Sequence, residues 1–526
     1  MPPSRAPVSA RVPWSSWADL TALDDAPSSG RAPRGPLPLR TVLLGTIGTV
    51  LVLLGSIGAG GTLVHDPILG SGPLSAFRYG HGKYLASAVV YLGFGLLVWA
   101  WVRLGRGVLA AQVGSRSVLL AAAAWIAPLL IAPPLFTRDV YSYLAQGLLA
   151  LHGFDPYSVG PSALTGPIPD NVHPFWQTTP APYGPLFIGL SKGVVLLAGG
   201  NVIAGVILMR LLLLVGLAML IHALPGLVRY LGGNLPVALW LAVAGPLTVV
   251  HLVGGPHNDL LMIGLLALGT LLALQGRHAS GIALVTLAMA IKATAGLVLP
   301  FLVWVWASRL SGPRLHRFVK AVVPAVLLYG AVFGACTALA EVGMGWLHGL
   351  SAPSLITTYT SVPTGLGQLL HSTTEAFLDV NAGVFIGVCR TLGGLALVVL
   401  LLWQWWQARD GGADAVQRAA LVLFAGAMLA PTMFPWYLSW SMALAAALPW
   451  TRRTLSVAAG ASVVLVLAYY PDGETGLYHW PSMAAAVGFA LLAAVSLIRF
   501  DPLGLGETFG GNHSHGAAIR SGTNGR

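Results

Sequence analysis

Apolar stretches of nearly twenty residues recur along this chain from residue 41 almost to its C-terminal end. Each is long enough to cross the ~30 Å hydrocarbon layer of a bilayer as a helix. In lipid, backbone N–H and C=O groups must bond within their own segment, so helices are the expected form. Only 9% of the 526 residues are Asp, Glu, Lys or Arg, whereas a soluble protein carries about 25%. The sequence therefore predicts an all-α, polytopic membrane protein.

Hydropathy predicts about 14 spans in one membrane domain, residues 41–498. Between them lie two large loops, residues 136–202 and 343–380. The terminal segments 1–40 and 499–526 are rich in Pro, Ser or Gly and are predicted to be disordered tails. The predicted spans are residues 41–63, 85–102, 117–135, 203–224, 235–252, 258–275, 279–292, 294–308, 320–342, 382–406, 418–431, 436–450, 454–470 and 482–498.

Two segments decide the topology. Residues 184–199 are short for a span, and residues 281–307 form either one long helix or two short ones. If 184–199 lies in the interface and 281–307 is a pair, Arg229 and Arg277 are cytoplasmic, where basic residues collect. The opposite choice puts Lys292 near mid-bilayer, at a cost of about 2.5–3.5 kcal/mol. We therefore predict cytoplasmic termini, with both large loops and Lys292 on the outer side.

The net charge of +11 fits the basic inner loops of a membrane protein, so no nucleic-acid partner is expected. Cys336 and Cys389 lie in apolar runs and are interpreted as small core residues. His513 and His515 lie in the C-terminal tail, where histidines are usually solvated, so no metal site is expected there.

Asp139 is the first candidate for chemistry. It follows directly on an apolar run, at the start of the larger loop. A general base must lie within hydrogen-bond reach of the proton that it removes, and a carboxylate at a span end is reachable by a lipid-linked substrate. Alternatively, Asp139 pairs with Arg138 or caps a short interfacial helix predicted at 141–153. Asp155, which precedes Pro156, indicates a turn.

A second candidate is the polar segment HLVGGPHND at 251–259. His257, Asn258 and Asp259 crowd together between two spans. The segment is a simple connection, or it binds a ligand to which its glycines allow close backbone approach.

Cationic and aromatic residues form the remaining candidates. Lys292 separates two short apolar runs, and Arg210 and Arg390 lie about two helical turns inside their predicted spans. These three side chains would bind a phosphate at the headgroup level, or the arginines snorkel outward or bond helix ends. Trp436 and Tyr437 anchor the interface or stack on sugars.

Six segments together resemble the actinobacterial polyprenol-phosphomannose-dependent α-1,6-mannopyranosyltransferases, members of the GT-C glycosyltransferases. The resemblance covers nearly the whole chain between the tails. The segments are TRDVYSYLAQG at 137–147, GFDPYSVGP at 153–161, APYGPLF at 181–187, GPLTVVHLVGGPHNDLLM at 245–262, AIKATAGLVLPFLVWVW at 290–306 and YPDGETGLYHW at 470–480.

The resemblance implies an inverting mannosyltransferase of lipomannan synthesis in the bacterial plasma membrane, with its active site facing outward. The donor would be polyprenyl-phosphate-mannose and the acceptor a lipid-anchored α-1,6-mannan, elongated at its 6-hydroxyl. Asp139 matches the family's catalytic aspartate. No cofactor is expected, because Val140 and Tyr141 follow Asp139 and no Asp-X-Asp pair forms. The candidate substrate-binding residues are Arg138, Tyr141, His257, Asn258, Asp259, Lys292, Arg210, Arg390, Trp436 and Tyr437.

Other functions stay open at this point. A transporter or flippase for lipid-linked sugars would share the arginines and aromatics, although such folds often contain repeats and none is visible here. A GT-C transferase of another sugar and a scaffold subunit are further alternatives. The match is nearer to enzymes of distal than of proximal mannan elongation.

Overall fold

A computed structural model describes residues 37–67 and 70–499. Within these ranges the regular structure is helical, apart from one isolated β-bridge between Tyr469 and Thr475. The prediction of an all-α protein is confirmed. Most of the two predicted tails, including His513 and His515, lies outside the described residues.

Seven described helices are long and apolar enough to cross a membrane, and an eighth span arises if α8 (Leu235–Ala242) and the π-helix η6 (Leu247–Gly254), bent by 45°, count as one. This confirms a polytopic membrane protein, although length and composition do not fix the number of crossings. The seven helices are α2 (Leu39–Ala59), α3 (Gly80–Leu109), α7 (Val202–Leu231), α12 (Arg314–Ala340), α15 (Ala382–Gln407), α16 (Gly412–Leu429) and α19 (Trp480–Ile498).

The other predicted spans correspond to shorter helices, which pack among the long ones. The predicted span at 436–450 contains only α17 (Leu438–Ala445) after a 3₁₀ turn at Pro435–Tyr437. Eight residues reach about 12 Å, so α17 cannot cross a bilayer alone. The remaining short helices are α4 (Ser115–Ile126), α9 (Asp259–Leu274), α10 (His278–Met289), α11 (Leu299–Ala307) and α18 (Arg452–Val466).

The segment 281–307 is a pair of helices, as predicted. The chain breaks after α10 at Lys292, whose backbone is extended (φ −147°, ψ 124°), and a 3₁₀ turn at Ala293–Val298 leads into α11. The break exposes Lys292 to neighbouring segments instead of enclosing it in one continuous helix.

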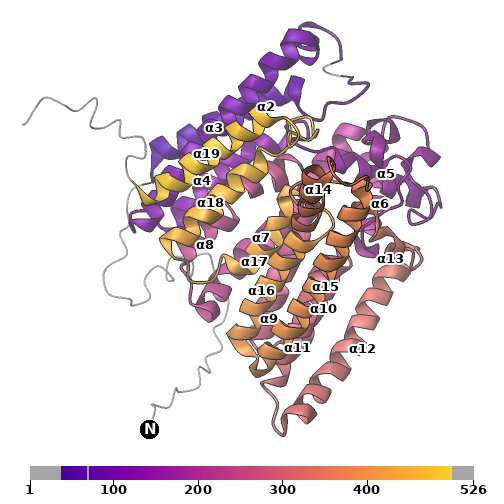
Figure 1. Ribbon diagram of the computed structural model, residues 1–526, viewed down its shortest axis with the longest axis vertical. Helices are drawn as coiled ribbons and strands as arrows, with labels where there is room; N and C mark the ends of the chain where they lie inside the picture. Colours follow the sequence, from indigo (N-terminus) through magenta and orange to yellow (C-terminus); the bar gives the residue numbers. More distant parts are fainter. Residues whose placement is uncertain (1–36, 68–69, 500–526) are drawn as a thin grey trace, which may run out of the picture.

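The last helix, α19, returns to the first part of the bundle, where it packs against α3 and also against α18 (Figure 1). In the view of Figure 1 the helices α7, α9, α16 and α17 lie near the middle, and α12 stands at the lower right. α9 is almost entirely buried.

The two large loops contain helices of their own and meet at one end of the bundle (Figure 1). The first holds α5 (Asp139–Leu151) and α6 (Pro185–Ala198), and the second holds α13 (Trp346–Gly349) and α14 (Val362–Thr374). A Cβ on Gly349 would lie 2.4 Å from the carbonyl oxygen of Ala181, so the loops pack without intervening space there.

Candidate active site

Asp139 is the first residue of α5, and its side chain is 21% exposed. Its backbone N–H donates to Thr137 Oγ1 at 3.0 Å. Three residues earlier, Phe136 has φ of +59°, a conformation that bulky residues rarely adopt unless their surroundings impose it. The Phe136 N–H donates to the Pro471 carbonyl at 2.9 Å. This turn fixes the position from which the Asp139 carboxylate projects.

Neither alternative considered for Asp139 is found. The residue that caps α5 is Arg138, and it does so without a side-chain hydrogen bond. Among the ion pairs of the described residues, Asp139 is matched with His257 and not with Arg138. Arg138 instead donates through Nε to the Asn171 carbonyl at 3.1 Å. Asp155 is structural as expected, since its Oδ1 accepts the Tyr157 N–H in a turn.

The segment after η6 brings His257 to Asp139. A Cβ on Gly255 would lie 2.3 Å from the Leu135 carbonyl oxygen, so only glycine allows this close approach. The glycine therefore allows contact with the chain leading into α5. Because the backbone segments around Leu135 and Gly255 are packed directly against each other, the nearby side chains of Asp139 and His257 are held close together.

His257 is fully buried and oriented on three sides. Its Nδ1 lies 2.7 Å from the His251 carbonyl oxygen. Because a carbonyl only accepts, Nδ1 carries the hydrogen and the neutral ring has a lone pair at Nε2. Nε2 lies 3.6 Å from Asp139 Oδ2, and the ring stacks on Trp436 with centroids 3.7 Å apart. The Nε2 lone pair repels a carboxylate, so the contact between His257 and Asp139 is favourable only when one of the two side chains carries a shared proton.

Asp259 and Lys292 form an ion pair beside this histidine. Lys292 Nζ lies 2.8 Å from both carboxylate oxygens of Asp259, which is fully buried, and Trp440 Nε1 donates to Oδ1. The ammonium lies 4.8 Å from the Tyr437 ring centroid, a cation–π distance. The adjacent Asn258 amide is buried without a hydrogen-bond partner among the described residues, which is unusual in the absence of water or ligand.

A cavity of about 280 Å³ opens over Asp139. Its walls are rich in aromatic side chains, which provide flat apolar faces, and in polar groups. Residues from both large loops and from the segment before α19 line it. The lining residues are Phe136, Thr137, Arg138, Asp139, His173, Phe175, Trp176, Leu355, Ile356, Thr357, Thr358, Phe434, Trp436, Tyr469, Gly473, Glu474, Thr475 and Tyr478.

Tyr143, Tyr183 and Trp440 belong to this site, although sequence reasoning did not select them. The Tyr143 and Tyr183 rings pack edge to face, 5.1 Å apart. Burial, followed by the Tyr183 phenol and the carboxylates of Asp139 and Asp259, raises the pKa of Tyr143 well above its ordinary value. Its hydroxyl therefore stays protonated as a hydrogen-bond donor. The only signal was the position of Tyr143 four residues after Asp139, one helical turn along α5.

Three predicted substrate-binding residues have other contacts. Arg210 is 2% exposed and donates to the carbonyls of Val253, Gly254 and Leu130. Arg390 donates to the carbonyls of Ser354 and Ile356 and to Thr364 Oγ1. Tyr141 is buried and donates to the Gly61 carbonyl at 2.6 Å. These contacts favour the alternative that the arginines bond helix ends, since three of the five N–H groups of each guanidinium are already bonded within the protein.

Replacement of Arg210 by Met is expected to lower stability and to leave substrate affinity in the surviving protein unchanged. The change removes three hydrogen bonds from a charged donor and leaves buried carbonyls unpaired, so a loss of about 3 kcal/mol is expected. Thermal unfolding in detergent measures it. A raised KM for the donor at unchanged melting temperature would show instead that Arg210 contacts substrate.

Comparison with known proteins identifies the family. The protein-family model described as "Alpha-(1->6)-mannopyranosyltransferase, N-terminal domain" matches residues 42–308. A second family model, described as "MptB C-terminal domain", matches residues 363–499. Alpha-(1->6)-mannopyranosyltransferase A of Mycobacterium tuberculosis is 41% identical over 87% of this chain and 89% of its own length. This chain belongs to the alpha-(1->6)-mannopyranosyltransferase family.

Two further relatives support the membership. Alpha-(1->6)-mannopyranosyltransferase A of Corynebacterium glutamicum is 31% identical over 86% of this chain and 96% of its own. Alpha-(1->6)-mannopyranosyltransferase B of the same organism is 26% identical over 88% and 83%. No solved structure matches the chain. The protein is therefore a mannosyltransferase of the membrane, and the transporter and scaffold alternatives are set aside.

Proposed function

We propose that this protein transfers mannose from polyprenyl-phosphate-mannose to the 6-hydroxyl of a lipid-anchored α-1,6-mannan, with inversion at the anomeric carbon. The observation that carries the proposal is the placement of Asp139. It lies in the wall of an aromatic-lined cavity, 3.6 Å from a buried histidine that can share its proton.

In the proposed step, the acceptor 6-oxygen attacks the anomeric carbon as its proton passes to Asp139. The bond between that carbon and the donor phosphate oxygen breaks from the opposite face, and polyprenyl phosphate leaves with the electron pair. Aromatic side chains such as Trp176 and Tyr478 line the cavity and offer faces for sugar rings. A protonated Asp139 must then return its proton to solvent before the next cycle.

Lys292 is the proposed contact for the leaving phosphate. Two of its three ammonium hydrogens point to the Asp259 oxygens, which leaves the third for a ligand. Its side chain is 14% exposed. In the proposed complex the donor phosphate lies against this fixed cation, which stabilises the charge that develops as the bond breaks. In this proposal Arg210 and Arg390 do not touch the phosphate, and they hold the chain around the site.

His257 is proposed to stabilise the protonated form of the base. Since Nδ1 is held by the His251 carbonyl, Nε2 can accept a proton shared with Asp139. The proton taken from the acceptor then lies in a hydrogen bond between Asp139 and His257 Nε2, which are already next to each other.

Replacement of His257 by Asn is expected to lower kcat by about tenfold with little change in KM, because an effect on the proton acts only as the bond forms. Asn retains an N–H for the His251 carbonyl and cannot reach Asp139. The Gln variant, whose amide reaches as far as Nε2, is expected to retain more activity. Equal losses in both variants, or a loss seen only in KM, would contradict the proposal. Steady-state kinetics in detergent measure both parameters.

The proposed reaction takes place at the outer face of the plasma membrane, with both termini cytoplasmic, and elongates the distal part of the lipomannan core. The distal assignment rests on the resemblance of the sequence to enzymes of distal elongation; identity is also higher to the two relatives named A than to the relative named B. Cysteines introduced at Thr165 in the first loop and at Ser311 between α11 and α12 should differ in labelling by an impermeant maleimide on intact cells, with only position 165 labelled. Labelling of position 311 alone would reverse the orientation.

The proposal is tested by incubating the purified protein with radiolabelled polyprenyl-phosphate-mannose and short α-1,6-mannan acceptors. A product lengthened by one α-1,6-linked mannose is expected. Transfer from GDP-mannose alone, or to a hydroxyl other than the 6-hydroxyl, would overturn the donor or the linkage respectively.

Transfer is also expected to proceed at full rate in EDTA. Asp139 lacks a second aspartate two residues later, and Asp259 is occupied by Lys292 and Trp440. A loss of activity that added Mg²⁺ or Mn²⁺ restores would contradict this expectation.

A further inference from the structure

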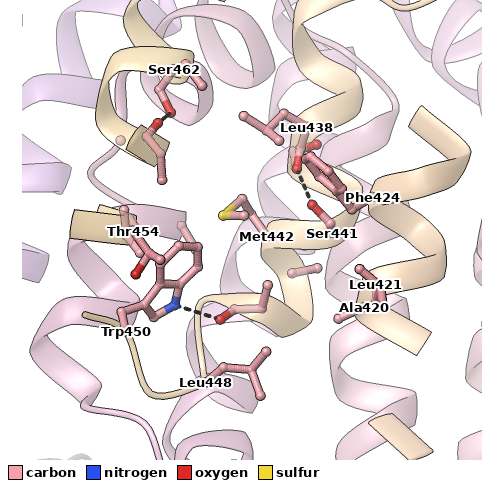
Figure 2. A pocket seen from close by; sticks show the side chains of 18 of the residues that line it. Ala420, Leu421, Phe424, Leu438, Ser441, Met442, Leu448, Trp450, Thr454 and Ser462 are labelled. Carbon is pink, nitrogen blue, oxygen red and sulfur yellow. Dashed lines mark hydrogen bonds between the residues drawn. The ribbon is translucent and has the colours of Figure 1, made fainter. Parts of the chain in front are cut away.

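A second and larger cavity, of about 800 Å³, lies between α16, α17 and α18. Figure 2 shows it from close by, with Thr454 and Ser462 of α18 on one side, Leu421 and Phe424 of α16 on the other, and Met442 of α17 between them. Its volume is in the range of sites that hold a small molecule. Trp440, which bonds Asp259, projects from the other side of α17 and does not line it.

The cavity opens sideways, toward the bilayer. Leu421, Phe424 and Val457 line it and are also 45%, 41% and 71% exposed. On membrane-spanning helices such exposed apolar side chains face hydrocarbon. The mouth of the cavity is therefore in contact with lipid.

Away from its charged end, the cavity wall has polar side chains that are already bonded within the protein. Ser441 Oγ donates to the Leu438 carbonyl, and Ser462 Oγ to the Ala458 carbonyl. Trp450 Nε1 donates to the Ala445 carbonyl at 2.8 Å, as Figure 2 also shows. A stable water cluster needs free polar partners, so a hydrocarbon chain suits these walls better.

One end of the cavity is charged, and it is the end far from Asp139. Asp414 and Arg418 at the start of α16 line it, together with Arg453 at the start of α18. The 18 residues of α16 span about 27 Å, close to the thickness of the hydrocarbon layer. The charged end therefore lies at the membrane surface opposite to the one that Asp139 faces.

Arg453 has no carboxylate partner among the described residues, whereas Arg418 is paired with Asp414 at 2.7 Å and with Gln404. A cation without a partner at a headgroup level attracts anionic lipid. A further cavity of about 550 Å³ beside α11 and α12 is lined by apolar side chains and Tyr329, with no charged residue among them. This cavity therefore has no cation that could bind the phosphate of a lipid headgroup.

We propose that the larger cavity binds one hydrocarbon chain of an anionic phospholipid from the leaflet opposite Asp139, with its phosphate at Arg453. The chain enters between α16 and α18 and packs against Met442. The bound lipid supports α17 from the side opposite Trp440. This site is independent of the proposed sugar donor and of the role of Asp139.

The test uses the full-length protein in nanodiscs of phosphatidylcholine that contain a trace of photoactivatable phosphatidylglycerol or phosphatidylcholine, each with a diazirine on its acyl chain. Crosslinked peptides are identified by mass spectrometry. Labelling within residues 420–462 by the phosphatidylglycerol probe is expected to exceed labelling by the phosphatidylcholine probe about five-fold, which corresponds to about 1 kcal/mol.

Two matched pairs of variants locate the headgroup and the chain. Arg453→Gln should reduce the phosphatidylglycerol labelling about five-fold, whereas Arg452→Gln, the same change one residue away and outside the cavity, should not. Ala458→Trp should block labelling by both probes, whereas Ala396→Trp on the exposed face of α15 should not. Size-exclusion chromatography establishes that each variant is folded.

Equal labelling of the segment by the two probes would overturn the proposal, since the cavity would then hold bulk lipid without headgroup preference. Labelling that persists in Ala458→Trp, or a loss shared by both arginine variants, would do the same. Because none of these measurements uses mannosyl transfer, failure here leaves the proposed function standing, and the reverse is also true.

Discussion

Replacement of Asp139 by Asn is expected to lower the rate of mannosyl transfer by about 10²–10⁴-fold, the range typical of a lost general base. An amide of the same shape cannot take up the proton of the attacking hydroxyl. The protein should remain folded, because Asp139 is partly exposed and its ionisable neighbour His257 lies 3.6 Å away, beyond a good hydrogen bond. The measurement is kcat with labelled donor, alongside the melting temperature.

Asp170→Asn provides the matched control. Asp170 lies in the same loop, is exposed and does not line the cavity over Asp139. This variant should retain full activity. If Asp139→Asn transferred mannose at the wild-type rate, the base would have to be another group, and the proposed mechanism would fall.

Much of the fold could be predicted from the sequence because a lipid environment leaves few solutions. Long apolar runs have to form helices, and each long helix described here coincides with a predicted span. The break at Lys292 was also predictable, since a lysine in mid-bilayer is costly and an interruption in the helix relieves that cost. The short length of α17 was not, because hydropathy does not distinguish an eight-residue helix with apolar flanks from a full span.

The contacts of the site could be predicted only in part. Asp139 and His257 are far apart in the chain and meet because Gly255 lies against Leu135, which depends on tertiary packing. For Arg210, an apolar surrounding indicates only that its N–H groups must find acceptors. From the sequence, a phosphate and backbone carbonyls are equally possible acceptors for these N–H groups. In the structure, three backbone carbonyls accept them.

Replacement of Lys292 by Met is expected both to destabilise the protein and to abolish transfer. Asp259 is fully buried, and loss of its cation leaves an uncompensated charge. Removing one partner of such a pair typically costs about 3–5 kcal/mol. Thermal unfolding in detergent measures this loss. By itself, however, the variant does not distinguish a structural lysine from one that contacts the donor phosphate.

The double variant Asp259→Asn with Lys292→Met separates these two roles. Asn carries no charge and still accepts the Trp440 N–H, so stability should return close to the wild-type value, since replacing both partners of a buried pair is often neutral. Transfer should remain lost, because the cation proposed to stabilise the leaving phosphate is still missing. Recovery of activity together with stability would show that the pair only supports the fold. The developing phosphate charge would then require another cation, and Arg138, which lines the same cavity as Asp139, would be the next candidate.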